Sequence, residues 1–151
     1  MNLVFRSESE VDTRALGRRL ASFLRPNDVI ALCGELGSGK TAFAAGLAEG
    51  LGISERVTSP SFILSRRYDG GFMPLVHADV YRLTSMAEFD DLGVFEEARD
   101  AVLVVEWGDA VMPELPSDQL TMEIQVVDES TRILRLFPRG RWAERPLEEL
   151  G

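Results

Sequence analysis

The sequence predicts a three-layer α/β fold with a mixed, partly antiparallel central sheet, and three patterns support this prediction. Residues 29–33 form a continuous apolar run that ends at a glycine-rich segment, as buried strands often do. Residues 101–105 form a second apolar run of the same character. Residues 120–127 and 133–137 alternate around Asp128-Glu129-Ser130, which predicts an antiparallel hairpin. Helical segments between the strands supply the outer layers.

The N-terminal part of the chain alternates segments typical of strands and helices. We expect an edge strand at 3–5, a helix from Ser9 or Asp12 to about Leu24, a strand at 29–33 and a helix at 40–51. Apolar side chains recur at helical spacing in both helices. Pro26 and Gly52 follow the two helices and stop them.

The middle of the chain predicts a hairpin and a further helix before the second apolar strand. We expect a strand at 63–68, a turn at 69–71, a returning strand at 74–81, a helix at 84–91 and a helical turn at 109–115. Residues 1–137 are expected to form a single domain. Residues 138–151 are rich in arginine and proline, and we expect them to be a loosely attached tail.

Residues 34–41 read Gly-Glu-Leu-Gly-Ser-Gly-Lys-Thr and match the phosphate-binding pattern G-x-x-x-x-G-K-[ST]. Composition alone gives roughly one accidental match per thousand such chains. Lys40 is the single lysine among sixteen lysine and arginine residues, and its compact ammonium suits a position between the β- and γ-phosphates. The segment therefore predicts a P-loop NTPase fold. Its candidate nucleotide-binding residues are Glu35, Leu36, Gly37, Ser38, Gly39, Lys40 and Thr41.

The base of the nucleotide is expected to be adenine. P-loop GTPases generally read guanine with an [NT]-K-x-D element, and this chain has no second lysine with which to build one. We therefore expect ATP as the nucleotide. A small-molecule kinase stays open, although no arginine-rich lid or acceptor site is evident in the sequence.

A triphosphate site requires Mg²⁺, and Thr41 is expected to supply one oxygen ligand. Two strand-end carboxylates, Asp79 and Glu106, are candidates to complete the site. Glu106 is placed first, because its strand is more apolar and is expected beside the strand at 29–33. The other carboxylate is then expected to position the attacking water. Either carboxylate taken alone could instead cap a neighbouring helix.

Two further polar residues, Thr58 and His77, lie close in sequence to the candidate site segments. Thr58 lies in the connection after the helix at 40–51, where P-loop proteins often contact the γ-phosphate; a solvated turn is the equal alternative. His77 is the only histidine and has no neighbouring cysteine or histidine in the sequence. We therefore expect His77 to be a packing residue and not a ligand or base.

Composition narrows the partners and the compartment. The net charge of −9 argues against a broad basic surface for nucleic acid. A single cysteine, Cys33, excludes an internal disulfide and favours a reducing compartment. The N-terminal residues contain no long apolar stretch, so we expect neither a signal peptide nor a membrane span. These observations together predict a cytoplasmic protein.

Five segments in a fixed order resemble the TsaE family (formerly YjeE) of small bacterial ATPases. They are Gly34 to Thr41, Thr58-Ser59-Pro60-Ser61-Phe62, His77-Ala78-Asp79-Val80-Tyr81-Arg82-Leu83, Asp91-Leu92-Gly93 and Val104-Val105-Glu106-Trp107. The similarity runs from about residue 27 to 136. The P-loop alone is widespread, and the other segments at these separations make the resemblance specific.

The resemblance implies a function in tRNA threonylcarbamoyladenosine synthesis. TsaE-like proteins work with TsaB and TsaD, the pair that transfers the threonylcarbamoyl group to an adenosine of certain tRNAs. They do not perform the transfer themselves. Their weak Mg²⁺-dependent ATP hydrolysis, stimulated by these partners, supports repeated turnover, so contact with tRNA is expected to be indirect. The rivals are a small-molecule ATP-dependent kinase and a non-hydrolysing, nucleotide-sensing adaptor.

The resemblance also implies roles for individual residues. Lys40 and the P-loop amides hold the phosphates, and Thr41 and Glu106 bind Mg²⁺. Asp79 is implied as essential for hydrolysis and Thr58 as part of a switch-like loop. The remaining implied residues are Trp107 near the functional surface and Arg132 on a late strand near the nucleotide.

Overall fold

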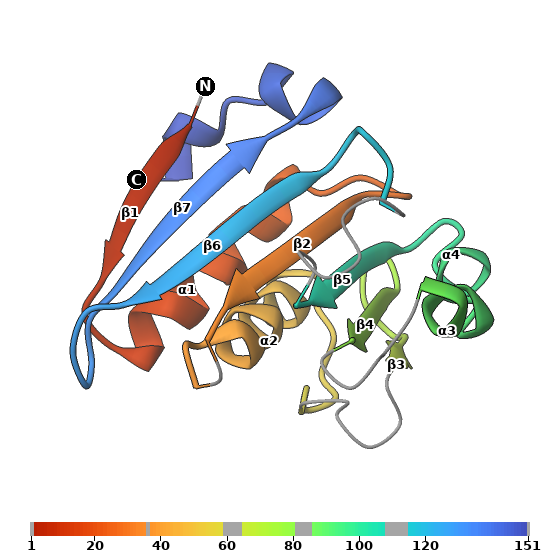
Figure 1. Ribbon diagram of the computed structural model, residues 1–151, viewed down its shortest axis with the longest axis horizontal. Helices are drawn as coiled ribbons and strands as arrows, with labels where there is room; N and C mark the ends of the chain where they lie inside the picture. The colour runs from red at the N-terminus through yellow and green to blue at the C-terminus, as the bar shows by residue number, and fades with distance from the viewer. Residues whose placement is uncertain (1, 36, 59–64, 81–85, 108–114, 151) are drawn as a thin grey trace.

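The computed structural model describes residues 2–35, 37–58, 65–80, 86–107 and 115–150 and has the predicted α/β architecture (Figure 1). Its strands are β1 (Leu3–Ser7), β2 (Val29–Gly34), β3 (Ser65–Tyr68), β4 (Leu75–Asp79), β5 (Val102–Glu106), β6 (Leu120–Val126) and β7 (Arg132–Pro138). Its helices are α1 (Glu10–Leu20), α2 (Lys40–Gly50), α3 (Met86–Asp91) and α4 (Val94–Glu97), with 3₁₀ turns η1 (Ala21–Phe23), η3 (Gly140–Glu144) and η4 (Leu147–Leu150).

The strands form one seven-stranded mixed sheet in the order β1-β7-β6-β2-β5-β4-β3. The central strands β6, β2, β5 and β4 are parallel to their neighbours in this group. Antiparallel pairs flank them, β1–β7–β6 on one side and β3–β4 on the other. The expected position of β5 directly beside β2 is confirmed, and so are both predicted hairpins.

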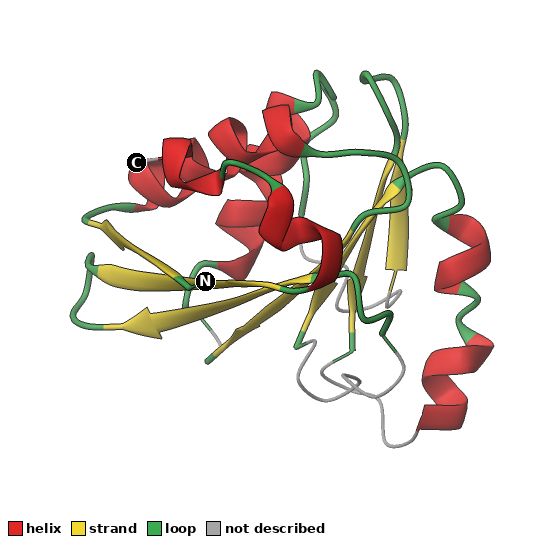
Figure 2. Ribbon diagram, turned by 90° about the horizontal axis from the view of Figure 1, so that it is seen from above, coloured by secondary structure: helices red, strands yellow, loops and turns green. Residues whose placement is uncertain are grey.

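Helices cover both faces of the sheet, which gives the three predicted layers (Figure 2). One hydrophobic cluster joins α1, α2 and the C-terminal 3₁₀ turns to the first face. A second cluster joins α3 and α4 to the opposite face over β4 and β5. Within the described part of the chain, none of the helices is long and apolar enough to cross a membrane.

Two glycines allow α1 and α2 to approach each other closely. A Cβ atom on Gly46 would lie 2.0 Å from the carbonyl oxygen of Arg14, and one on Gly17 would lie 2.4 Å from that of Phe43. Glycine weakens an isolated helix, so the two residues serve the helix–helix contact and not the helices themselves. The contact fixes α2, which begins directly after the glycine-rich segment at 34–39.

Several element boundaries differ from the predicted ones for local reasons. Ser9 is the N-cap of α1, and its side chain accepts from the backbone N–H of Asp12. The α-helix ends at Leu20 and continues only as the 3₁₀ turn η1, so it is shorter than expected. The predictions for 109–114 and for the ends of the 63–68, 74–81 and 84–91 elements fall outside the described residues.

The predicted loose attachment of residues 138–151 is wrong. Trp142, Leu147 and Leu150 are each 1% exposed and belong to the core cluster that contains α1. Arg145 donates to both carboxylate oxygens of Asp28, at 2.7 and 2.8 Å, and its guanidinium lies 3.9 Å from the Trp142 ring centroid. Arginine and proline suggested a solvated tail, but the apolar residues between them carry the packing.

We expect the replacement Arg145→Ala to lower the free energy of unfolding by about 3–5 kcal/mol, because it leaves the buried Asp28 carboxylate without its cation. The matched control is Arg141→Ala, since the Arg141 side chain is 81% exposed. That control should change stability by less than about 0.5 kcal/mol. Urea unfolding measures both variants. Equal and small effects would contradict the assigned anchoring of the C-terminal segment.

Candidate active site

The P-loop connects the end of β2 to the start of α2. Gly39 is the N-cap of α2 and has φ +111°, and Gly37 has φ +79°, conformations that side chains with a Cβ rarely adopt. The first N–H groups of α2 have no carbonyl partner within the helix and point toward the loop. This arrangement is the usual anion-binding end of a helix. Leu36, one of the predicted binding residues, lies outside the described residues.

Lys40 is held against its own loop. Its Nζ donates to the carbonyl oxygens of Gly34 and Glu35, at 2.8 and 2.9 Å. The same atom lies 4.0 Å from the ring centroid of Trp107, a cation–π distance. Two carbonyls and an aromatic face therefore surround the ammonium. Lys40 as a whole is only 4% exposed.

A cavity of about 390 Å³ opens over the P-loop and collects most of the predicted site residues. Its lining comes from the loop and α2, from α1, from the ends of β4 and β5, and from the β6–β7 hairpin. The residues are Ser9, Glu10, Thr13, Gly37, Ser38, Gly39, Lys40, Thr41, Ala42, Asp79, Glu106, Trp107, Glu129, Ser130 and Arg132. The exposed Glu35 does not line this cavity.

Thr58 lies beside this cavity and not in its wall. It lines a neighbouring hollow of about 640 Å³, which shares Glu10, Thr41 and Ala42 with the first cavity. Its backbone N–H donates to the hydroxyl of Tyr68 at 3.4 Å. The structure thus places Thr58 in the wall of a hollow that Thr41 also lines. Ser59 and the rest of that predicted loop fall outside the described part.

The two candidate carboxylates lie side by side. Asp79 and Glu106 are partners in the parallel register of β4 and β5, and they are 5% and 3% exposed. The Thr41 hydroxyl donates to Glu106 Oε2 at 3.1 Å. These are oxygen donors of the kind that Mg²⁺ prefers, and Mg²⁺ commonly takes only one or two carboxylates beside phosphates and waters. Among the described residues, no group of three or more His, Cys, Asp or Glu could hold a metal ion.

His77 is part of this group of side chains, contrary to the expectation from the sequence. The residue is fully buried, as expected for packing, but its Nε2 lies 2.5 Å from Glu106 Oε2. A signal was available, since residues two apart on a strand share a face and His77 precedes Asp79 by two. The expectation of a purely packing role is therefore corrected.

Arg132 ties the β6–β7 hairpin to the P-loop. Its Nε donates to the Ser38 carbonyl oxygen at 3.0 Å, and its Nη2 lies 3.4 Å from the Gly37 carbonyl oxygen. Its Nη1 donates to the carbonyl oxygen of Asp128 at 2.7 Å. The guanidinium thus lines the cavity and connects two of its walls, the P-loop and the β6–β7 hairpin.

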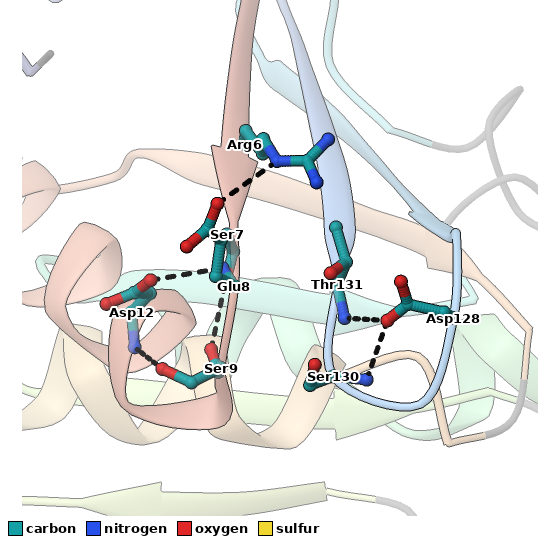
Figure 3. A network of polar contacts seen from close by, with 8 residues as sticks. All are labelled: Arg6, Ser7, Glu8, Ser9, Asp12, Asp128, Ser130 and Thr131. Carbon is teal, nitrogen blue, oxygen red and sulfur yellow. Dashed lines mark hydrogen bonds and ion pairs between the residues drawn. The ribbon is translucent and has the colours of Figure 1, made fainter.

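Two capped turns stand next to each other (Figure 3), and each contributes a residue to the cavity lining, Ser9 on one side and Ser130 on the other. On one side, Ser9 accepts from the N–H of Asp12, whose own carboxylate accepts from the N–H of Glu8. On the other side, Asp128 Oδ1 accepts from the N–H groups of Thr131 and Ser130, at 2.8 and 3.0 Å. The Thr131 and then the Ser130 hydrogen bonds lower the pKa of the Asp128 carboxyl below its ordinary value of 3.8.

This shift predicts how the hairpin turn responds to pH. A depressed pKa in the folded state means that the Asp128 charge contributes its full stabilisation above the ordinary value of 3.8. The contribution is lost as the pH falls through the lower, folded-state pKa. A ¹³C NMR titration of the Asp128 carboxyl should therefore show a midpoint below 3.8. In urea unfolding, the stability difference between wild type and Asp128→Asn should shrink as the pH falls from 7 to 3. A carboxyl midpoint at or above the ordinary value would refute this assignment.

Comparisons with known proteins support one family. Residues 7–134 match the family model described as "Threonylcarbamoyl adenosine biosynthesis protein TsaE". The tRNA threonylcarbamoyladenosine biosynthesis protein TsaE of Streptomyces coelicolor is 44% identical over 91% of this chain and 99% of its own length. The protein of the same name from Bacillus subtilis is 38% identical over 99% of this chain and 94% of its own.

A solved structure gives the same result for the fold. The crystal structure of Bacillus subtilis YdiB superimposes with a TM-score of 0.81 at 34% sequence identity. The match covers 99% of this chain and 94% of the other. The alignment therefore includes the C-terminal turns as well as the P-loop sheet.

Proposed function

The chain belongs to the TsaE family of tRNA threonylcarbamoyladenosine biosynthesis proteins, and we propose that its part in that pathway is to bind and hydrolyse ATP with Mg²⁺. One observation carries the proposal. A P-loop lysine and threonine share a single cavity with two buried strand-end carboxylates, Asp79 and Glu106. Phosphate binding, metal binding and orientation of a water are the three tasks of ATP hydrolysis, and each has a candidate group here.

In the proposed mechanism the P-loop holds the triphosphate. Lys40 and the backbone N–H groups of residues 37–41 neutralise the phosphate oxygens, and Thr41 and Glu106 hold Mg²⁺. When bound at these residues, Mg²⁺ would supply positive charge that offsets the charge of the phosphates. The hydrogen bond from Thr41 to Glu106 supports this choice of carboxylate, because it joins the two proposed ligands directly.

Asp79 is left to orient the attacking water and accept its hydrogen bond. Its position beside Glu106 in the strand register supports this division of roles. Arg132 is proposed to stabilise the P-loop through the Ser38 carbonyl and to face the nucleotide from the hairpin. Thr58 and Thr41 line the same hollow beside the cavity, and we propose that Thr58 contributes to the γ-phosphate side of the site when nucleotide is bound.

We further propose that the ATPase is weak alone and acts on a TsaB–TsaD complex in the cytoplasm. The family resemblance supports these partners, and tRNA would be met through the complex. The net charge of −9 agrees with indirect contact, because it disfavours an extended phosphate-backbone interface. The single cysteine agrees with a reducing compartment.

The variant Lys40→Ala tests nucleotide binding and hydrolysis together. It removes the only lysine of the chain, and we expect phosphate release to fall by about 10²-fold or more. The matched control is Arg18→Ala, which removes an exposed cation that is paired with Glu49 and does not line the cavity. Isothermal titration with ATP and Mg²⁺, and a phosphate-release assay with and without TsaB and TsaD, provide the readouts.

Three outcomes separate the proposed function from its rivals. Slow phosphate release without an acceptor, accelerated by TsaB–TsaD, supports the proposal. Transfer of the γ-phosphate to a small metabolite identifies a kinase instead. ATP-dependent association with TsaB–TsaD, lost in Lys40→Ala while the wild type releases no phosphate, identifies an adaptor.

A further inference from the structure

Glu106 receives two hydrogen bonds on the same oxygen, and their donors come from different layers of the fold. Thr41 reaches Oε2 from the start of α2, at 3.1 Å, and His77 reaches it from β4, at 2.5 Å. His77 is fully buried and Glu106 is 3% exposed, so water does not compete for this contact. We propose that His77 is a positioning residue that holds the Glu106 carboxylate in the orientation required for a divalent cation. This inference rests on the proposed function.

The hydrogen bonds of the imidazole lie on one side of its ring. A carboxylate oxygen accepts, so the contact assigns the shared hydrogen to Nε2. The other ring nitrogen, Nδ1, is buried and has no hydrogen-bond partner among the described residues. The hydrogen bond that the structure gives the His77 ring therefore goes to the Glu106 carboxylate.

A purely packing role does not account for this residue. β4 is fully buried along its length, and an aliphatic side chain would fill position 77 without leaving a nitrogen unsatisfied. Burial of an unpaired polar atom is unfavourable. The imidazole is thus costly for folding at this position, and its one distinctive contact is with Glu106.

The geometry explains how such a contact affects metal binding. Both donors occupy Oε2, so Oε1 is the oxygen that neither of them uses. Mg²⁺ requires nearly ideal octahedral geometry, which makes it sensitive to the orientation of a carboxylate ligand. Removal of the groups that orient a ligand typically weakens metal binding or activity about 10–100-fold. We therefore expect the loss of His77 to weaken the binding of Mg²⁺ and to change the affinity for metal-free ATP little.

The experiment measures the affinity for ATP by isothermal titration in EDTA and across a series of Mg²⁺ concentrations. His77→Leu should raise by about 10–100-fold the Mg²⁺ concentration at which the gain in ATP affinity is half-maximal. The affinity of this variant for ATP in EDTA should stay within about twofold of that of the wild type. His77→Gln should restore most of the Mg²⁺ response, because its amide nitrogen can replace Nε2 as donor. His77→Asn is too short to reach Glu106 and should behave like His77→Leu. Val76→Ala is the control for packing loss, since Val76 is buried on the same strand in the opposite hydrophobic cluster.

The outcomes distinguish this inference from the function on which it rests. If the wild type shows no Mg²⁺-dependent ATP binding, the proposed function is wrong and the inference fails with it. If the wild type responds to Mg²⁺ and all three His77 variants respond equally well, only the inference is overturned. A loss shared equally by His77→Gln and Val76→Ala also overturns it, because packing would then explain the effect. If His77→Leu does not fold, the comparison of His77→Gln with His77→Asn decides.

Discussion

The parallel pairing of β2 with β5, and of β5 with β4, is the constraint on which the rest of the site depends. Parallel strands end at the same edge of a sheet, so the loop after β2 and the last residues of β4 and β5 meet there. The register is specific, since it sets Asp79 directly beside Glu106. A shift of one residue would turn the carboxylates to the opposite face, away from α2. The chemistry of the cavity is therefore a consequence of strand register.

This edge concentrates charge that the fold must accommodate. Lys40, Asp79 and Glu106 are each at most 5% exposed. Burial of charges is unfavourable unless partners compensate for the lost water, and here carbonyls, an aromatic ring, a hydroxyl and an imidazole do so. Such a cluster contributes little to stability by itself. We propose that its arrangement serves the binding of a charged ligand and a cation.

The remainder of the domain holds this edge in place. The close contact of α1 with α2 through Gly46 fixes the helix that carries the P-loop amides. Arg132 joins the β6–β7 hairpin to the P-loop backbone, and the two capped turns carry Ser9 and Ser130, which line the cavity. Arg145, through its bond to Asp28, and Trp142, through its packing in the cluster that contains α1, hold the C-terminal turns against the core. The family relationship extends over these parts as well, because the solved relative aligns along nearly the whole chain.

The sequence by itself determined the fold class, most strands and helices, the P-loop and the two strand-end carboxylates. These features depend on local composition and periodicity, which a single chain displays directly. Tertiary structure decided the rest. The contact of His77 with Glu106 joins residues 29 apart in the chain, and that of Arg145 with Asp28 joins residues 117 apart. Contacts of this kind depend on strand register and on the packing of distant segments, for which no local pattern in the sequence is sufficient. For the same reason, the C-terminal segment looked solvated from its arginines and prolines and proved to be part of the core.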